Sequence, residues 1–254
     1  METINKSISV LVRNLNPITK LLIVFCLGIG CLIYPLPFVG YGILGLLVIL
    51  GSLIGQGKKI LKLVFGFGIP VTLMLLFIQG LYSPKNKTMI ADFGFAQMGL
   101  EGTMYALKIS STLLVFLVAF YLMLQTTRNS ETVAALTQSG LNMKIGYLIL
   151  ASLNVVPQMQ RKVKVIQEAQ ESRGVETSGT FIQRAKAFLP LIGPVVLSSL
   201  TDAQERGMTL ETRGFGISGV KPTSYIKVET TGLDIVLRII AICFLLSSLA
   251  PRFL

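Results

Sequence analysis

The chain contains no histidine and no tryptophan, and it is poor in charged residues and in cysteine. Without histidine it has no imidazole to act as a general base, to ligate a metal ion or to complete a Ser–His–Asp triad. Charged residues make up 14% of the 254 positions, whereas an ordinary soluble domain has roughly 25%. All three cysteines lie in apolar runs, which excludes a disulfide framework and a cysteine zinc site: they are Cys26, Cys31 and Cys243.

Apolar residues dominate what is present. They make up 52% of the chain, and the mean hydropathy is +0.70. The 23 basic residues outnumber the 12 acidic ones, which gives a net charge of +11. This balance excludes a disordered or collagen-like chain, and it predicts an all-α integral membrane protein.

Long uncharged runs predict where the transmembrane helices lie. Residues 21–57 carry no formal charge, and a span needs about 20 residues, so this run holds two spans. The sequence Tyr34-Pro35-Leu36-Pro37 predicts the turn between them, because each proline removes a donor and restricts its predecessor. We expect about five transmembrane helices: four in a membrane domain of residues 1–127, at about 17–34, 37–56, 63–84 and 105–127, and a last one within 231–254.

The last predicted span contains two charged residues, Asp234 and Arg238. They are four positions apart and therefore share one helix face, where they can form an ion pair. Their place in the first turns of the helix predicts a position near the membrane interface.

Positive charge predicts the orientation of the chain in the membrane. Lys6, Arg13 and Lys20 lie before or at the start of the first span, and three more lysines lie in segment 56–62, whereas the turn at 34–37 is uncharged. Basic residues accumulate on the cytoplasmic side. We therefore expect a multi-pass membrane protein with the N-terminus and segment 128–230 in the cytoplasm.

Segment 128–230 is the charged part of the chain, with 12 of the 23 basic and 8 of the 12 acidic residues. It also contains two apolar stretches, Ile145–Val156, which stops at Pro157, and Ala187–Leu200, which two prolines interrupt. Both are shorter than a span, so we expect interfacial or buried pieces. The alternative is two short spans that place 157–186 outside, against the positive-inside bias.

An amphipathic helix follows each apolar stretch. Apolar residues recur at helical spacing on one side, with charged residues on the other, and such a stripe needs a partner surface. The first stripe is Val156, Met159, Val163 and Ile166, and the second is Val196, Leu200 and Ala203.

The two amphipathic helices end alike, in Ser172-Arg173-Gly174 and Thr212-Arg213-Gly214. One interpretation is a helix cap, in which glycine takes a left-handed conformation and arginine complements the helix dipole. The other is a partner-binding end, because a guanidinium suits a carboxylate and glycine permits close approach. A cap alone does not require arginine at the same offset twice.

These paired endings, before a last span, resemble those of the T component of energy-coupling factor (ECF) transporters. The resemblance extends to the Leu15-Asn16-Pro17-Ile18-Thr19-Lys20 entry to the first span. It implies a non-catalytic transmembrane scaffold that couples ATP hydrolysis to the uptake of a vitamin or other micronutrient.

The resemblance also implies partners and roles. It implies that segment 128–230 is a cytoplasmic domain of coupling helices. It also implies that the two Ser/Thr-Arg-Gly ends bind the grooves of two ABC-type ATPase subunits. The apolar stripes contact a small membrane subunit, the S component, which captures the substrate. No cofactor is expected on this chain, because ATP and Mg belong to the ATPases.

Three other classes stay open, one of which is a structural membrane anchor for soluble partners without transport. A conventional ABC permease usually carries one coupling helix per subunit, whereas this chain carries two. A membrane-embedded transferase usually needs histidine or acid pairs, and the chain has no histidine and no Asp-rich motif.

Overall fold

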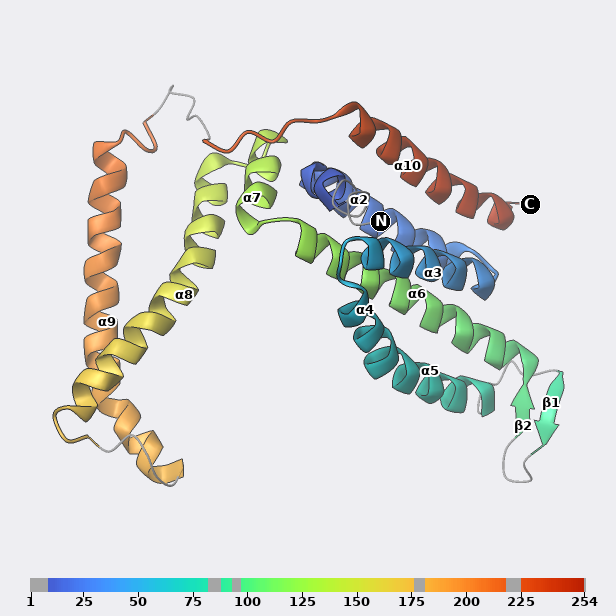
Figure 1. The fold of residues 1–254 in the computed structure, drawn as a ribbon, viewed down its shortest axis with the longest axis horizontal. Helices are drawn as coiled ribbons and strands as arrows, with labels where there is room; N and C mark the ends of the chain where they lie inside the picture. The colour runs from blue at the N-terminus through green and yellow to red at the C-terminus, as the bar shows by residue number, and fades with distance from the viewer. Residues whose placement is uncertain (1–8, 82–87, 93–96, 176–180, 218–224, 254) are drawn as a thin grey trace. The chain divides into compact units, whose positions relative to one another are not determined.

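The computed structural model of the chain describes residues 9–81, 88–92, 97–175, 181–217 and 225–253. Apart from one small hairpin, the regular structure of these residues is helical, which confirms the predicted all-α membrane fold (Figure 1). The hairpin pairs β1 (Met89–Asp92) with β2 (Gln97–Gly99) in antiparallel fashion. The helices are α2 (Pro17–Ile33), α3 (Pro37–Leu53), α4 (Gly57–Leu63), α5 (Ile69–Leu75), α6 (Leu100–Thr126), α7 (Asn129–Gln138), α8 (Met143–Glu171), α9 (Phe181–Thr212) and α10 (Gly232–Phe253).

The chain divides into two compact units. Unit 1 consists of Met1–Ala135 and Val228–Leu254, and unit 2 consists of Leu136–Lys227. The predicted segment 128–230 therefore contains all of unit 2. It also contains the whole of α7, most of which belongs to unit 1.

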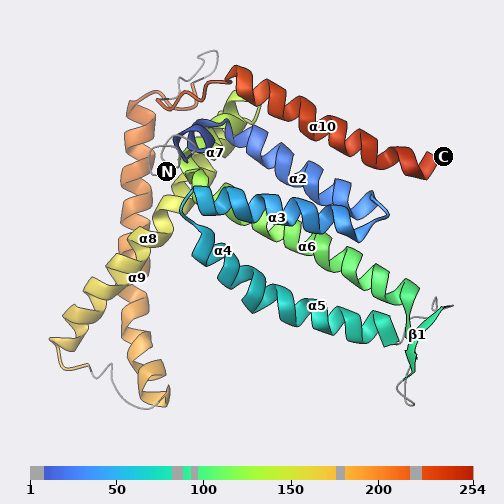
Figure 2. The same cartoon turned by 45° about the vertical axis from the view of Figure 1, so that its right-hand side comes forward.

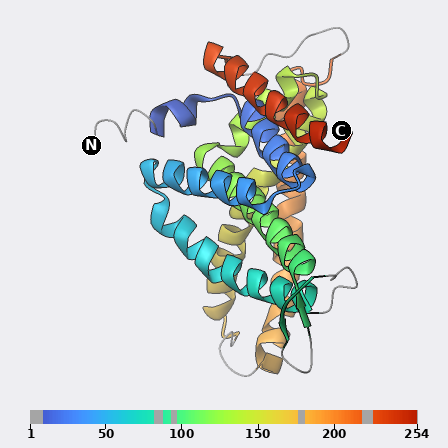
Figure 3. The same cartoon turned by 90° about the vertical axis from the view of Figure 1, so that its right-hand side faces the viewer.

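Unit 1 is built around α6. This helix packs against α2 and α3, and α2 packs in turn against α10 (Figures 2 and 3). Buried apolar side chains from α2, α3, α4 and α6 form one core: Val24, Cys31, Leu44, Leu47, Ile60, Leu114, Val115, Val118, Ala119, Leu122 and Met123. Cys26 and Cys31 are buried free thiols, and Cys243 is an exposed one.

The start of α2 and the break after it follow from local sequence. The Asn16 side chain accepts a hydrogen bond from the backbone N–H of Ile18 at 3.0 Å, and Pro17 occupies the first turn, so the helix is capped as such sequences allow. Tyr34 is extended before Pro35, and α3 begins at Pro37. The break between the two helices falls at the turn that the sequence predicts.

The third apolar helix begins earlier than the sequence suggested. It runs from Gly57 to Gly80 without interruption, whereas we expected a span at 63–84. Two π-helical turns, η1 (Val64–Gly68) and η2 (Leu76–Gly80), lie on either side of α5. Pro70 is the second residue of α5, and because it has no N–H to donate, the hydrogen-bond pattern shifts locally in η1 rather than ending the helix. Residues 82–84 lie outside the described part.

Three helices of the described part are long and apolar enough to cross a membrane: Gly57–Gly80, Leu100–Thr126 and Gly232–Leu249. Pro17–Ile33 and Pro37–Leu53 are shorter apolar helices. α6 starts at Leu100, ahead of the expected 105, and its first turn includes Glu101, whose carboxylate accepts a 2.8 Å hydrogen bond from the Thr88 hydroxyl. The order in which these helices cross the bilayer stays a prediction.

The expected ion pair of α10 does not form. The carboxylate of Asp234 accepts hydrogen bonds from the backbone N–H groups of Asn16 and Thr231, both at 2.9 Å. Arg238 donates instead from Nε to the hydroxyl of Thr19 at 2.8 Å. The spacing permitted the pair, but backbone donors at the starts of α2 and α10 satisfy the carboxylate instead.

Unit 2 consists mainly of α8 and α9, which cross in antiparallel directions (Figure 1). The apolar stretch that stops at Pro157 is not a separate helix, because α8 runs through Pro157 without interruption. α9 likewise runs through Pro190 and Pro194. An internal proline removes one hydrogen bond and strains the helix by roughly 3 kcal/mol, which the remaining turns of these long helices offset.

Candidate subunit-binding site

The two Arg-Gly ends share one backbone geometry. Gly174 has φ +86° and donates its N–H to Glu171 O at 2.9 Å, and Gly214 has φ +74° and donates to Glu211 O at 2.9 Å. Each glycine thus ends its helix in the left-handed region, which favours glycine over other residues. This confirms the helix-cap interpretation of both glycines.

The hydroxyl of each ending is used inside its own helix. Ser172 Oγ donates to Glu168 O at 3.0 Å, and Thr212 Oγ1 donates to Thr209 O at 3.0 Å. Both hydroxyls therefore help to close a helix end. In Ser172-Arg173-Gly174 and in Thr212-Arg213-Gly214, the arginine is therefore the residue whose side chain is available to bind a partner.

The side chains of Arg173 and Arg213 are exposed and make no hydrogen bond or ion pair with another described residue. A contrast lies within α9 itself, where a third arginine, Arg206, also precedes a glycine. The Arg206 guanidinium donates to the Gln158 side chain and is half-buried. The two terminal arginines thus differ from Arg206 in that no intramolecular contact explains them.

The residues that follow Arg213 and Gly214 contact the start of α8. Phe215, which follows Gly214, packs its ring on Tyr147 of α8 with centroids 5.1 Å apart. A Cβ at Gly216 would also lie 3.7 Å from Lys144 Cε. The Arg213 end is therefore fixed against the start of α8.

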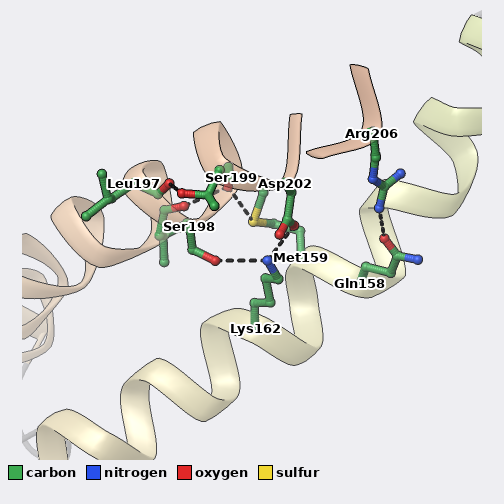
Figure 4. A network of polar contacts seen from close by, with 10 residues as sticks. Gln158, Met159, Lys162, Leu197, Ser198, Ser199, Asp202 and Arg206 are labelled. Carbon is green, nitrogen blue, oxygen red and sulfur yellow. Dashed lines mark hydrogen bonds and ion pairs between the residues drawn. The ribbon is translucent and has the colours of Figure 1, made fainter. Parts of the chain in front are cut away.

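The seam between α8 and α9 is polar (Figure 4). Lys162 forms an ion pair with Asp202 and donates to Ser198 Oγ at 2.9 Å. Ser199 Oγ lies 3.7 Å from the sulfur of Met159. The sequence analysis missed this seam, although the i, i+4 spacing of Ser198, Asp202 and Arg206 on α9 was a signal for it.

Some residues of the predicted apolar stripes are half-buried, and the others are exposed. Met159, Val163 and Ile166 are half-buried, and Met159 lies at the seam. The rest of the predicted set lies on exposed surface: Val156 at 59%, Val196 at 59%, Leu200 at 56%, and Ala203. A hollow of about 440 Å³ beside Met159 is lined by Val155, Val156, Met159, Gln160 and Val163. Unit 2 thus presents apolar side chains that its own helices do not cover.

In the part of the chain that the structure describes, no group of three or more His, Cys, Asp or Glu residues is placed to hold a metal ion. The features with functional potential are therefore the two arginine ends and the exposed apolar surface.

Comparisons with known proteins identify the class. Residues 9–226 match the CbiQ family, described as cobalt transport protein. The chain is 28% identical over 240 residues to the energy-coupling factor transporter transmembrane protein EcfT of Bacillus subtilis (strain 168), covering 88% of this chain and 87% of the relative. It is 25% identical over 259 residues to EcfT of Acidaminococcus fermentans, covering 92% of each. It is 25% identical over 172 residues to EcfT of Macrococcus caseolyticus, covering 63% of this chain and 64% of that protein.

The chain therefore belongs to the CbiQ family, as an EcfT-like transmembrane component of an energy-coupling factor transporter. Its long apolar helices agree with a place in a membrane.

Proposed function

We propose that the chain is the scaffold of an ECF-type importer, which links two ABC-type ATPase subunits to a small membrane S component that captures a vitamin or other micronutrient. The chain itself is non-catalytic and holds no cofactor, and ATP and Mg are bound by the ATPases. Its N-terminus and segment 128–230 lie in the cytoplasm of a bacterial cell, where the ATPases are.

The observation that carries this proposal is the pair of matching arginine ends. Arg173 and Arg213 each lie just beyond the end of a long helix. Their side chains are exposed and form no hydrogen bond or ion pair with another described residue. A guanidinium in that position suits a carboxylate in a groove of another protein, which it can bind through two parallel hydrogen bonds. Two equivalent ends suit two equivalent partners.

The exposed apolar side chains support the second part of the proposal. Val156, Val196 and Leu200 are more than half exposed, and exposed apolar patches of this kind mark binding surfaces for proteins or membranes. We assign the predicted stripes to the S component, which is itself a hydrophobic membrane subunit.

The test is purification of the affinity-tagged chain in mild detergent from cells that contain the whole transporter. We expect two ATPase subunits per chain and a small hydrophobic subunit in the same complex. A homodimer of this chain with ATPases and no third component would instead indicate a conventional ABC permease, and recovery of the chain alone would contradict both assignments.

A further inference from the structure

Two charged side chains of unit 1 are buried where α2 and α10 begin. Lys20 is 6% exposed and Asp234 is 0% exposed. Neither forms an ion pair with another described residue. Charged side chains are rarely buried in this way unless something in the structure requires them.

Lys20 is bound by the end of α6. Its Nζ donates to Thr126 O at 3.0 Å, to Thr127 Oγ1 at 3.0 Å and to Arg13 O at 3.3 Å. Thr126 is the last residue of α6, so the ammonium group lies where helix carbonyls lack intrahelical partners and the helix dipole is negative. The lysine thereby fixes the C-terminus of α6 to the first turn of α2.

Asp234 is bound by the entry to α2. Its two carboxylate oxygens accept the N–H groups of Asn16 and Thr231, each at 2.9 Å. The Asn16 amide also donates to Thr230 Oγ1 at 3.4 Å. These bonds fix the residues that precede α10 to the same turn of α2.

The two attachments lie on the unit 1 side of the two places where the chain passes between the units. Unit 2 is Leu136–Lys227, so the chain enters it within α7, beyond Thr126, and returns from it shortly before Thr230. Asn16 and Lys20 are one helical turn apart at the start of α2. One short segment therefore binds both stretches of unit 1 that lead to unit 2.

The free energy of folding alone does not require a charged side chain at either position. Burying a charge is unfavourable even when its hydrogen bonds are satisfied, and replacing such groups with hydrophobic ones is often neutral or stabilising. Elsewhere unit 1 buries neutral polar groups: Ser110 is 1% exposed, bonds to the Thr72 hydroxyl, and accepts from Tyr41 OH at 3.4 Å. Among the residues of unit 1 whose burial the structure describes, Lys20 and Asp234 are the buried charged ones.

We propose that the turn Asn16–Lys20 is a clamp that holds both connections rigid, so that movement of unit 2 is transmitted to the membrane helices. Without the clamp, the connections themselves absorb the movement, and ATP hydrolysis no longer drives uptake. The proposal rests on the proposed function, since it requires ATPases that move unit 2. Lys20 and Asp234 are positioning residues here, because each is buried within unit 1 and acts through the residues that it binds.

The test uses the complete transporter reconstituted in vesicles, with uptake and ATP hydrolysis measured on the same preparation. We expect Lys20→Met to retain both ATPases and to hydrolyse ATP, while uptake per ATP falls at least about tenfold. Lys20→Arg keeps the donor and should restore most of the ratio. Ser110→Ala, the buried polar control at a distance from the connections, should leave the ratio unchanged.

A double-mutant cycle separates the clamp from general stability. Thr127→Val alone should lower uptake per ATP slightly, and added to Lys20→Met it should lower it no further, because its partner is already gone. Unchanged uptake per ATP in Lys20→Met would overturn the proposal, as would loss of the ATPases from that complex, which would make Lys20 an assembly residue. Failure of the wild-type chain to purify with ATPases would instead refute the proposed function.

Discussion

Units 1 and 2 place charged side chains in opposite ways. Unit 1 buries Lys20 and Asp234, and their charged groups hydrogen-bond to residues of the same unit. Unit 2 leaves the side chains of Arg173 and Arg213 exposed. The two buried charges of unit 1 are thus bound within their own unit, whereas the two arginines of unit 2 are free to bind another molecule.

The contrast extends to the contacts between helices. In unit 1 the core is apolar and continuous over four helices, whereas the seam of unit 2 is an ion pair with a few hydroxyl contacts. Partly exposed ion pairs contribute little stability. Packing between helices therefore contributes less to the arrangement of unit 2 than to that of unit 1.

The largest expected effect concerns the orientation of the chain in the membrane, because each position should be either labelled from outside the cell or not labelled at all. In a background without the three native cysteines, a single cysteine at Thr88 should react with a membrane-impermeant thiol reagent added to intact cells, and cysteines at Lys58 and Glu168 should not. All three positions are exposed in the structure, so access to each depends on the membrane alone. Labelling at Glu168 from outside would favour the alternative in which two further spans carry part of unit 2 across the membrane.

A charge in each unit should have very different effects. Val118→Asp introduces an unpartnered charge at a fully buried position, which costs about 4 kcal/mol or more, so little folded protein should be recovered. Leu200→Asp changes an exposed position, so the chain should insert and purify normally but retain less of the S component. The measurement is the monodisperse yield in detergent beside the amount of S component bound. If the Leu200→Asp chain binds as much S component as the unchanged chain, the apolar stripe that contains Leu200 does not bind the S component.

Glycine replacement in α3 tests the packing of unit 1. A side chain at Gly51 would collide with Ile60 Cδ1, whereas one at Gly45 would meet nothing within 4 Å. Gly51→Leu should therefore destabilise the chain by about 1–3 kcal/mol through overpacking, and Gly45→Leu should not. Thermal unfolding of the two variants in detergent distinguishes them, and equal midpoints would contradict close packing of α3 on α4.

The smallest effect is expected at the seam of unit 2. Lys162→Met removes the ion pair with Asp202, whose partners are each about one third exposed, so the loss of stability should be about 1 kcal/mol or less. Thermal unfolding of this variant, with Lys164→Met on the exposed side of α8 as the control, provides the measurement. A loss several times larger would mean that the seam, and not the partners, determines how α8 and α9 cross.

Local signals in the sequence predicted much of this structure. The turn at Tyr34–Pro37 and the glycine caps at Gly174 and Gly214 depend on the conformations of single residues, so they can be identified without tertiary information. The continuity of α8 could not be predicted in the same way. Pro157 disfavours a helix locally, but the turns on both sides of it outweigh that effect.

The partners of charged residues were harder to predict than the helices. The spacing of Asp234 and Arg238 allowed a pair, but their actual partners include Asn16 and Thr19, which are more than 200 positions away in the sequence. The seam of unit 2 likewise joins residues about 40 positions apart. Only the packing of helices decides between such alternatives.

The central claim is that Arg173 and Arg213 bind the two ATPases. Alanine at either site removes a charge-assisted contact but leaves the glycine cap intact, and truncating one side of such a pair costs roughly 2–5 kcal/mol when it is buried. Single variants should therefore assemble but transport poorly, and lysine should restore them only in part because it lacks the planar guanidinium. Arg206→Ala is the matched control, since Arg206 also precedes a glycine but bonds to Gln158 within unit 2.

The most direct measurement is ATPase retention on the affinity-purified Arg173→Ala/Arg213→Ala chain, with Arg206→Ala purified in parallel. The account predicts that the double variant loses both ATPases while the Arg206 control keeps them. Wild-type retention by the double variant would contradict it, and would leave the two Arg-Gly endings as helix caps only.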